Sequence, residues 1–273
     1  MLELRPLSDA LGVEVVDVDL AAPPDPAVVA EIVDAWLEHH LVLFRDQELT
    51  AEDHVRVATW FGEIDHQGIT MRPDDTVMYI SNDPAVGPGG DGALLLHSDF
   101  CFGEHPLRAI SLYGVEVPPQ GGGTVFANAE RAYEKLPDFL RVRLHELHAL
   151  HAFDYRRTGG GGRIAEADLE PDSPRKVRPA IWVHPDTGRP ILYVNELMTT
   201  RFVELPDNES AALLEAVAGY FVGDDVVYVH EWEPHDLVVW DNRSLQHGRT
   251  DFEPTERRTL RRVPVHGGAA RAG

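Results

Sequence analysis

A histidine and an aspartate, His97 and Asp99, stand two residues apart within the apolar segment LLLHSDFCF at 94–102. The apolar residues predict a buried strand, in which residues i and i+2 face the same side. A carboxylate buried alone is costly, so it needs a partner, either a divalent cation or the histidine itself. For the pair alone, a buried histidine–aspartate hydrogen bond is the favoured interpretation, and metal binding requires a third ligand from elsewhere.

The best third ligand is His247, which follows the strand-like segment and turn of DLVVWDNRSLQH at 236–247. Two histidines and one carboxylate form a facial triad that leaves three adjacent coordination positions open. That arrangement suits a non-haem Fe(II) ion that activates oxygen. Zinc is the rival metal, although three-ligand zinc sites more often draw on other combinations.

A second group of histidines competes with this interpretation. His145, His148 and His151 recur every three residues, and we expect them on one face of a helix over 130–147 and beyond. No carboxylate is placed to complete a metal site with them. We interpret these histidines as helix-surface and helix-end groups, with metal binding as the alternative.

Composition narrows the functional classes. The chain of 273 residues carries a net charge of −22, which disfavours nucleic acid and anionic membranes as partners. No apolar run approaches the roughly 20 residues needed to span a bilayer, and MLELRPLSDA does not resemble a signal peptide. A single cysteine, Cys101, fits a reducing cytoplasm, and its neighbours Phe100 and Phe102 indicate a packed thiol.

Basic residues gather near the end of the sequence, where RRTLRR occupies 257–262. In so acidic a protein, this segment indicates either a site for a small anion or a solvated basic strand end. Composition alone leaves both interpretations open.

The elements that must position these residues are mostly strands. Helices are predicted near 26–40 with Asp25 as N-cap, 51–64 with Thr50 as N-cap, 130–147 with a break at Pro137, and 207–221. Strands are predicted at 13–20, 41–45, 77–81, 94–102, 109–117, 180–185, 190–196, 226–233, 236–242 and 259–266. Few helices separate the late strands, which excludes an alternating βαβ pattern. We therefore expect an α+β, mainly β fold with a double-stranded β-helix, or jelly-roll, core and flanking helices.

No linker divides the chain, so residues 1–273 are expected to form one domain. The glycine run TGGGG at 158–162 and the polar residues after it do not favour regular structure. We expect residues of about 155–180 to form a mobile lid or loop insertion.

Several motifs together resemble the TauD/TfdA family, the taurine dioxygenase-like, Fe(II)- and 2-oxoglutarate-dependent oxygenases. They are HSD at 97–99, GGGT ending at Thr124, WDNRSLQH ending at His247, and RTLRR at 258–262. The resemblance continues through FGEI at 61–64, AYEKL at 132–136 and YVNELMTTRFVEL at 193–205. It covers most of the chain in the family's order.

The resemblance implies a role for each matched residue. His97, Asp99 and His247 match the catalytic iron ligands. Thr124 and Arg258 match the residues that bind the distal carboxylate of 2-oxoglutarate, and a planar guanidinium suits a carboxylate. Arg262 would face the same side as Arg258 in a strand and matches an arginine near the substrate's acidic group, whereas Arg257 and Arg261 are interpreted as surface charge.

The implied reaction consumes O2 and 2-oxoglutarate, releases succinate and CO2, and hydroxylates or otherwise oxidises a C–H bond of the substrate. Asp99 argues for oxygenation, because halogenating relatives lack this carboxylate. The resemblance further implies a homo-oligomer, a dimer or a tetramer. The alternative is a zinc-binding or catalytically inactive jelly-roll protein that binds 2-oxoglutarate.

The substrate is expected to differ from taurine. Ala93 replaces the asparagine that helps hold the amine in taurine dioxygenases, and FGEIDHQG offers Gln67 or Asp65, with His66 beside them, in place of a histidine that contacts the sulfonate. Leu94–Leu96, Phe100 and Phe102 suggest a larger or less polar molecule. We predict a small, anionic organic substrate. The expected substrate-binding residues are Arg262, Phe100, Gln67 and His66.

Overall fold

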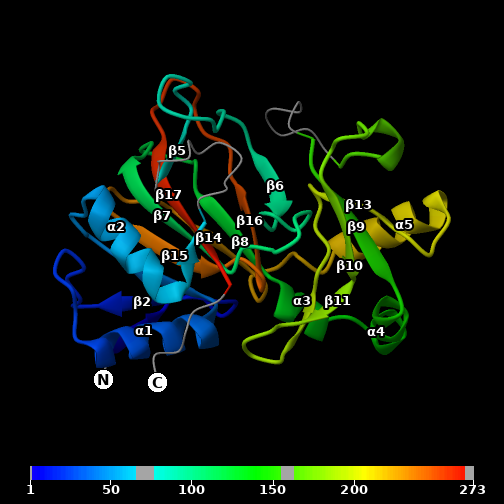
Figure 1. Ribbon diagram of the computed structural model, residues 1–273, viewed down its shortest axis with the longest axis horizontal. Helices are drawn as coiled ribbons and strands as arrows, with labels where there is room; N and C mark the ends of the chain where they lie inside the picture. Colours follow the sequence, from blue (N-terminus) through cyan, green and yellow to red (C-terminus); the bar gives the residue numbers. More distant parts are fainter. Residues whose placement is uncertain (1, 66–76, 155–162, 268–273) are drawn as a thin grey trace.

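Two β-sheets lie face to face in the computed structural model, which describes residues 2–65, 77–154 and 163–267 (Figure 1). The larger sheet has the order β1-β2-β3-β15-β7-β17-β4, and β5 also pairs with β17. Its strands are β1 (Glu3–Pro6), β2 (Val13–Val16), β3 (Leu41–Phe44), β4 (Glu63–Ile64), β5 (Met78–Ser81), β7 (Ala109–Glu116), β15 (Leu237–Asp241) and β17 (Thr259–His266). All pairs are antiparallel except β2 with β3.

The smaller sheet has the order β14-β8-β16-β6. Its strands are β6 (Leu94–His97), β8 (Thr124–Asn128), β14 (Val227–His230) and β16 (Leu245–Arg249). Apolar residues of the two sheets pack together in a shared core. There, Phe126 of β8 meets Trp240 of β15 edge-on, with ring centroids 5.2 Å apart. The structure thus confirms a mainly β protein with helices attached.

Two helices cover the outer face of the larger sheet. Helix α1 (Pro26–His39) begins at the N-cap Asp25, and α2 (Ala51–Ala58) begins at Thr50, which forms a capping box with Asp53. Both caps are as predicted, because short polar side chains satisfy the unpaired amides of a first turn. Trp36 of α1 packs edge-on against Phe61, with centroids 5.2 Å apart.

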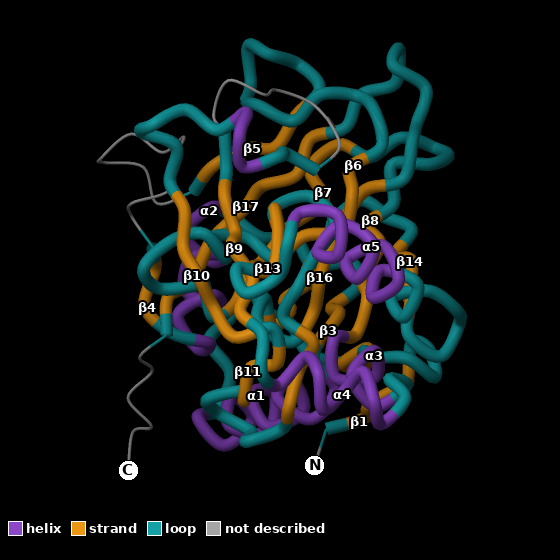
Figure 2. The backbone as a smooth tube through the Cα atoms, turned by 90° about the vertical axis from the view of Figure 1, so that its right-hand side faces the viewer, coloured by secondary structure: helices purple, strands orange, loops and turns teal. Residues whose placement is uncertain are grey.

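A third layer lies at the right in Figure 1. It contains a sheet of order β10-β9-β13, the hairpin β11-β12 and three helices around their own core. Its elements are α3 (Ala129–Glu134), α4 (Asp138–His145), β9 (His148–Ala152), β10 (Arg175–Pro179), β11 (Ile181–Val183), β12 (Pro190–Leu192), β13 (Thr199–Phe202) and α5 (Asp207–Ala218). In Figure 2, α1, α3 and α4 lie at the bottom, and loops surround β5 and β6 at the top.

The prediction that three histidines share one face of a helix is wrong. Helix α4 ends at His145, and the next two histidines belong to strand β9, which pairs on both sides with β10 and β13. In a strand, residues three apart face opposite sides. His148 is therefore exposed and bonded to Glu204, whereas His151 is buried beside Thr199.

The predicted helix over 51–64 is too long. It ends at Ala58, and a 3-10 turn (Thr59–Phe61) leads through Gly62 into β4. Gly62 has a φ of 151°, and a side chain there would clash with the His266 carbonyl oxygen. The close approach of β17 thus requires glycine here and diverts the chain from helix into sheet.

The predicted lid falls partly outside the described residues, since 155–162 are not among them. Within its described part, Arg175–Pro179 forms strand β10, and a 3-10 turn spans Glu166–Asp168. No helix of the described residues is long and apolar enough to cross a membrane.

Candidate functional site

Strand pairing brings two of the predicted ligands together. His247 of β16 is the direct register partner of His97 of β6, and their ring centroids are 4.2 Å apart. Both rings face the interior between the sheets, where His247 also packs 4.8 Å from Trp240. The backbone therefore places the two imidazoles side by side without help from a loop.

Asp99 reaches the same point by a different route than predicted. Strand β6 ends at His97 rather than continuing to 102, and the chain turns sharply, with Phe100 at a φ of +59°. A phenylalanine in this left-handed region is strained, so the surrounding packing must impose it. The turn brings Asp99 Oδ1 to 3.4 Å from His97 Nε2 and Oδ2 to 3.9 Å from His247 Nε2.

These three residues fit a metal ion. Their ligand atoms lie within 4.8 Å of one another, and no other group of three such residues in the described chain is as close. Metal bonds of about 2.0–2.2 Å to nitrogen and oxygen allow two ligands to be about 4.0–4.4 Å apart at most. Both histidine–aspartate distances are below this limit, and small shifts of the imidazoles would bring all three ligand atoms, now within 4.8 Å of one another, onto one ion. His97 Nδ1 bonds the Leu95 carbonyl at 2.9 Å, which leaves Nε2 free to coordinate.

The electrostatics keep Asp99 ionised. Burial by itself would raise the pKa of Asp99, but the Arg262 guanidinium and the two imidazoles outweigh it, leaving that pKa well below its usual range. Arg262 donates to Asp99 Oδ2 at 2.7 Å and lies 3.0 Å from the Met78 sulfur. Burial lowers the pKa of His247 to about 3, so its imidazole is neutral and able to bind a cation.

Thr124 begins β8, on the strand next to His247. Its Oγ1 accepts a hydrogen bond of 2.9 Å from Trp232 Nε1. An indole can only donate, so the threonine hydroxyl keeps its own proton for another acceptor. No acceptor for that proton is found among the described residues, and both side chains are buried.

Arg258 is a buried cation without a buried anion. Its Nε donates to the Gly122 carbonyl at 2.7 Å, and its backbone amide donates to Asn82. No carboxylate in the described part of the chain pairs with its guanidinium, although only 4% of the residue is exposed. Burial lowers the pKa of Arg258, and nearby Arg249 lowers it further. Such a group calls for an anionic ligand.

The two remaining arginines of the basic segment differ from each other. Arg257 is exposed and pairs with Asp83, as a surface charge should. Arg261 is buried, which corrects the prediction: its Nε bonds His54 at 3.2 Å, and its guanidinium lies 4.5 Å from the centre of the Tyr113 ring. Alternation along β17 turns Arg261 toward the helix-covered face, away from the metal ligands.

Aromatic side chains border the aspartate turn. Phe100 stacks on Phe102 at 5.5 Å, and Phe102 stacks on Phe153 at 5.2 Å, whereas Leu95 remains 37% exposed. Cys101 is a packed thiol, as predicted, and burial raises its pKa to about 12. Two predicted substrate-binding residues, Gln67 and His66, lie outside the described residues.

Sequence reasoning missed two residues of this site. Trp232 orients Thr124, and the strand alternation of VVYVHEWE was the available signal for an inward side chain. Asn242, whose side chain bonds the backbone of Asp99, stands in the turn after β15. A polar residue after a strand normally indicates only a turn, so its sequence carries no signal of this contact.

Comparison with known proteins agrees with the geometry. The model of the family "Taurine catabolism dioxygenase TauD, TfdA family" matches residues 3–263. Pentalenolactone F synthase of Streptomyces avermitilis is 33% identical over 276 residues, covering 93% of this chain and 90% of that protein. The (S)-phenoxypropionate/alpha-ketoglutarate-dioxygenase of Sphingobium herbicidovorans is 30% identical over 267 residues, covering 94% and 92%. The crystal structure of AAD-2 in complex with Mn(II) and N-oxalylglycine superposes with a TM-score of 0.82 at 26% identity, covering 98% of each chain.

Proposed function

The chain belongs to the TauD/TfdA family of dioxygenases, and we propose that it is an Fe(II)- and 2-oxoglutarate-dependent dioxygenase. It couples oxidative decarboxylation of 2-oxoglutarate, to succinate and CO2, with hydroxylation or a related C–H oxidation of a small organic molecule. The observation that carries this proposal is the convergence of His97, Asp99 and His247, together with Arg258, a buried arginine just before β17 that has no anionic partner among the described residues.

In the proposal, His97, Asp99 and His247 hold the metal. Bound there, Fe(II) would supply the activation of O2, the chemistry to which a set of two histidines and one carboxylate is suited. The Leu95 carbonyl fixes the tautomer of His97, and Arg262 keeps Asp99 charged and oriented. Neutral imidazoles and an ionised carboxylate are the protonation states that a cation requires.

Thr124 and Arg258 bind the distal carboxylate of 2-oxoglutarate. The Arg258 guanidinium has no anionic partner in the described chain, and the Thr124 hydroxyl has a proton to donate. Together they would supply charge-assisted hydrogen bonds to one carboxylate. The buried setting strengthens these bonds because water does not compete for the donors.

The substrate is a small anion other than taurine. A named relative acts on (S)-phenoxypropionate, a carboxylate joined to an aromatic ring. This chain offers comparable chemistry. Arg262 binds Asp99 through Nη2, but its Nη1 lies beside the weakly accepting Met78 sulfur and would donate to a substrate anion, while Phe100 offers an aromatic face. Gln67 and His66 complete the proposed substrate contacts.

The proposal extends to the chain as a whole. Residues 1–273 form one domain, the two facing sheets form a double-stranded β-helix, and the part of the predicted lid that precedes strand β10, about residues 155–174, forms a lid. The enzyme is cytoplasmic, a dimer or tetramer, and without nucleic acid or membrane partners. Its net charge of −22 and its single buried thiol support this assignment.

An anaerobic titration tests the proposal. Adding Fe(II) and 2-oxoglutarate to metal-free protein should produce a visible metal-to-ligand charge-transfer band, and Asp99→Ala should lose it. Retention of tightly bound zinc with no such band in the wild type would favour the zinc-binding alternative. An Asp99→Ala protein that titrates like the wild type would contradict the assigned ligands.

A panel of substrates tests the anionic class. With Fe(II), 2-oxoglutarate and O2 present, carboxylate-bearing aromatic and aliphatic compounds should stimulate succinate release, whereas their neutral amides or esters should not. Turnover of neutral compounds alone would overturn the assignment of an anionic substrate while leaving the reaction class intact.

A further inference from the structure

The turn that carries Asp99 is held by a side chain from a distant part of the chain. Asn242 stands in the turn between β15 and β16 and is fully buried. Its Oδ1 accepts from the Asp99 amide at 3.0 Å, and its Nδ2 donates to the Asp99 carbonyl at 2.9 Å. The second proton of Nδ2 is directed to the Leu107 carbonyl at 3.2 Å.

These hydrogen bonds take the place of those that a neighbouring strand would make to Asp99. Strand β6 has ended at His97, so the backbone groups of Asp99 have no partner in a sheet. The Asn242 amide presents a donor and an acceptor to them, as a neighbouring strand would. Aspartate lacks the donors and alanine lacks both groups, so asparagine is matched to this role.

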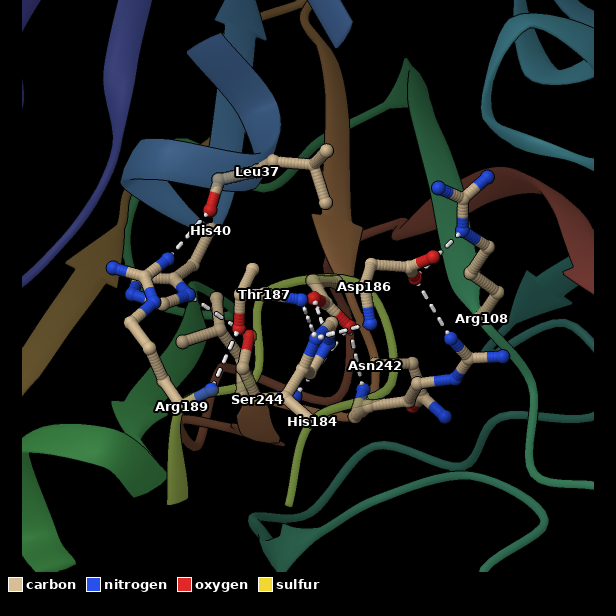
Figure 3. Close-up of polar contacts among 12 residues, drawn as sticks. Leu37, His40, Arg108, His184, Asp186, Thr187, Arg189, Asn242 and Ser244 are labelled. Carbon is tan, nitrogen blue, oxygen red and sulfur yellow. Dashed lines mark hydrogen bonds and ion pairs between the residues drawn. The ribbon is translucent and has the colours of Figure 1, made fainter. Parts of the chain in front are cut away.

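Hydrogen bonds and an ion pair with other segments hold the turn that carries Asn242. Its backbone amide donates to the Arg108 carbonyl at 3.0 Å. The neighbouring Asp241 accepts from the Arg243 amide at 2.9 Å and lies 2.7 Å from His184 Nε2. These groups join one side of the turn to the loop that follows β11 (Figure 3).

The loop that follows β11 contributes the carboxylate of Asp186, which contacts two arginines. Asp186 Oδ2 lies 3.2 Å from Arg108 Nε and 2.9 Å from the Arg243 guanidinium. Its backbone amide in turn donates to His184 Nδ1 at 3.2 Å. Figure 3 shows Asp186 directed toward Arg108, with Asn242 and His184 beside it.

We propose that Asn242 is a positioning residue for the metal-binding carboxylate of Asp99, braced by the Asp186 loop. This inference rests on the proposed function, since it takes Asp99 as a metal ligand. A metal ion needs its carboxylate in one place, yet Asp99 lies on a strained turn beyond the end of its strand. Groups that orient metal ligands typically contribute about 10–100-fold to metal affinity.

A matched control separates this role from plain stabilisation. Asn128 is also a buried asparagine whose amide bonds backbone groups, donating to Ala10 and accepting from Glu130 and Arg131. It caps α3 and does not contact the metal ligands. Asn128→Ala should therefore lower stability as Asn242→Ala does, without the same effect on the metal.

The experiment is an anaerobic titration of metal-free protein with Co(II), followed by the visible absorption of the bound ion. Thermal unfolding of each metal-free protein is measured in parallel. We expect Asn242→Ala to weaken Co(II) binding about 10–100-fold and to change the shape of the spectrum. Asn128→Ala should bind Co(II) as the wild type does, with a similar fall in melting temperature.

Other variants complete the test. Should Asn242→Ala not fold, Asn242→Ser, which cannot reach both backbone groups, must show the same weakening. Asp186→Asn should weaken Co(II) binding less, because it acts through the turn. Wild-type affinity and spectrum in a folded Asn242 variant would overturn the positioning role alone. A wild-type protein that binds no Co(II) at His97 and Asp99 would overturn the proposed function as well.

Discussion

Two buried arginines four residues apart, Arg258 and Arg262, have opposite electrostatic surroundings. Arg262 holds the Asp99 carboxylate at 2.7 Å, so its charge is balanced within the protein. Arg258 is similarly buried and, within the part of the chain that the structure describes, bonds only neutral groups, the nearest being the Gly122 carbonyl. The charge of Arg262 is thus balanced within the protein, whereas no anion among the described residues pairs with Arg258.

This difference indicates what each of the two arginines contributes. A buried cation that is already paired serves the protein's own carboxylate, and its removal should damage the empty protein. A buried cation without a partner is retained for a ligand, because an unpaired charge is costly to bury. Its removal should damage binding and leave the empty protein almost intact.

The largest expected effect comes from Arg258→Met. Losing one partner of a buried charge pair costs about 2–5 kcal/mol, so the KM for 2-oxoglutarate should rise about 30-fold to 4,000-fold. Steady-state succinate release over a range of 2-oxoglutarate concentrations measures it. Arg257→Met, at the exposed neighbour, should change KM by no more than about twofold. Equal effects of the two variants on KM would contradict the role of Arg258 in binding 2-oxoglutarate.

The next effect is on stability without ligands. In metal-free protein, Arg262→Met should lower the free energy of unfolding by about 3 kcal/mol, because it leaves the mostly buried Asp99 without its cation. Arg258→Met should cost no more than about 1 kcal/mol, the value of the bond to Gly122. Urea denaturation compares them, and a larger loss for Arg258→Met would contradict the distinction.

Low pH should lower the stability of the protein through a group that contacts neither Arg258 nor Arg262. Burial lowers the pKa of His40 to about 4, below its ordinary 6.5, so between these values the unfolded chain binds a proton that the folded chain does not. Stability is therefore full above pH 6.5 and falls toward pH 4, by about 1.4 kcal/mol per pH unit for this group. His40→Asn, which suits the left-handed backbone at φ 67°, should flatten the decline in urea denaturation series. An unchanged slope would exclude His40 as its source.

The smallest effect concerns the indole that orients Thr124. Trp232→Phe keeps the ring but removes one hydrogen bond, worth about 0.5–1.5 kcal/mol, so the KM for 2-oxoglutarate should rise about 2- to 12-fold. Trp36→Phe is the matched control, because its buried Nε1 has no hydrogen-bond partner in the described structure. If both substitutions left KM unchanged, Trp232 would have no part in presenting Thr124.

Local patterns predicted much of this arrangement. The caps Asp25 and Thr50 are short-range features, and the structure contains both. His97, Asp99 and His247 do converge, although the reason given for Asp99 was wrong, since a turn and not a strand delivers it. Residue types at suitable distances along the chain carried the prediction, and the exact backbone did not matter.

Contacts between residues far apart in the sequence could not be predicted from local patterns. Arg261 looked like surface charge because nothing near it in sequence reveals His54 and Tyr113, which cover it from other elements. His151 fitted a helical spacing, but pairing with two neighbouring strands overrode the local preference. Asn242 is informative only once the turn after β6 is known to lie against it.

In the proposed function, the direct pairing of His97 with His247 also fixes when the protein can acquire its metal. Asp99 and the arginine that holds it, Arg262, are 163 residues apart in the sequence. Contacts so distant along the chain form slowly, because the intervening loop must close first. A chain emerging from the ribosome therefore presents only scattered donors until β16 docks beside β6, and metal loading follows folding rather than guiding it.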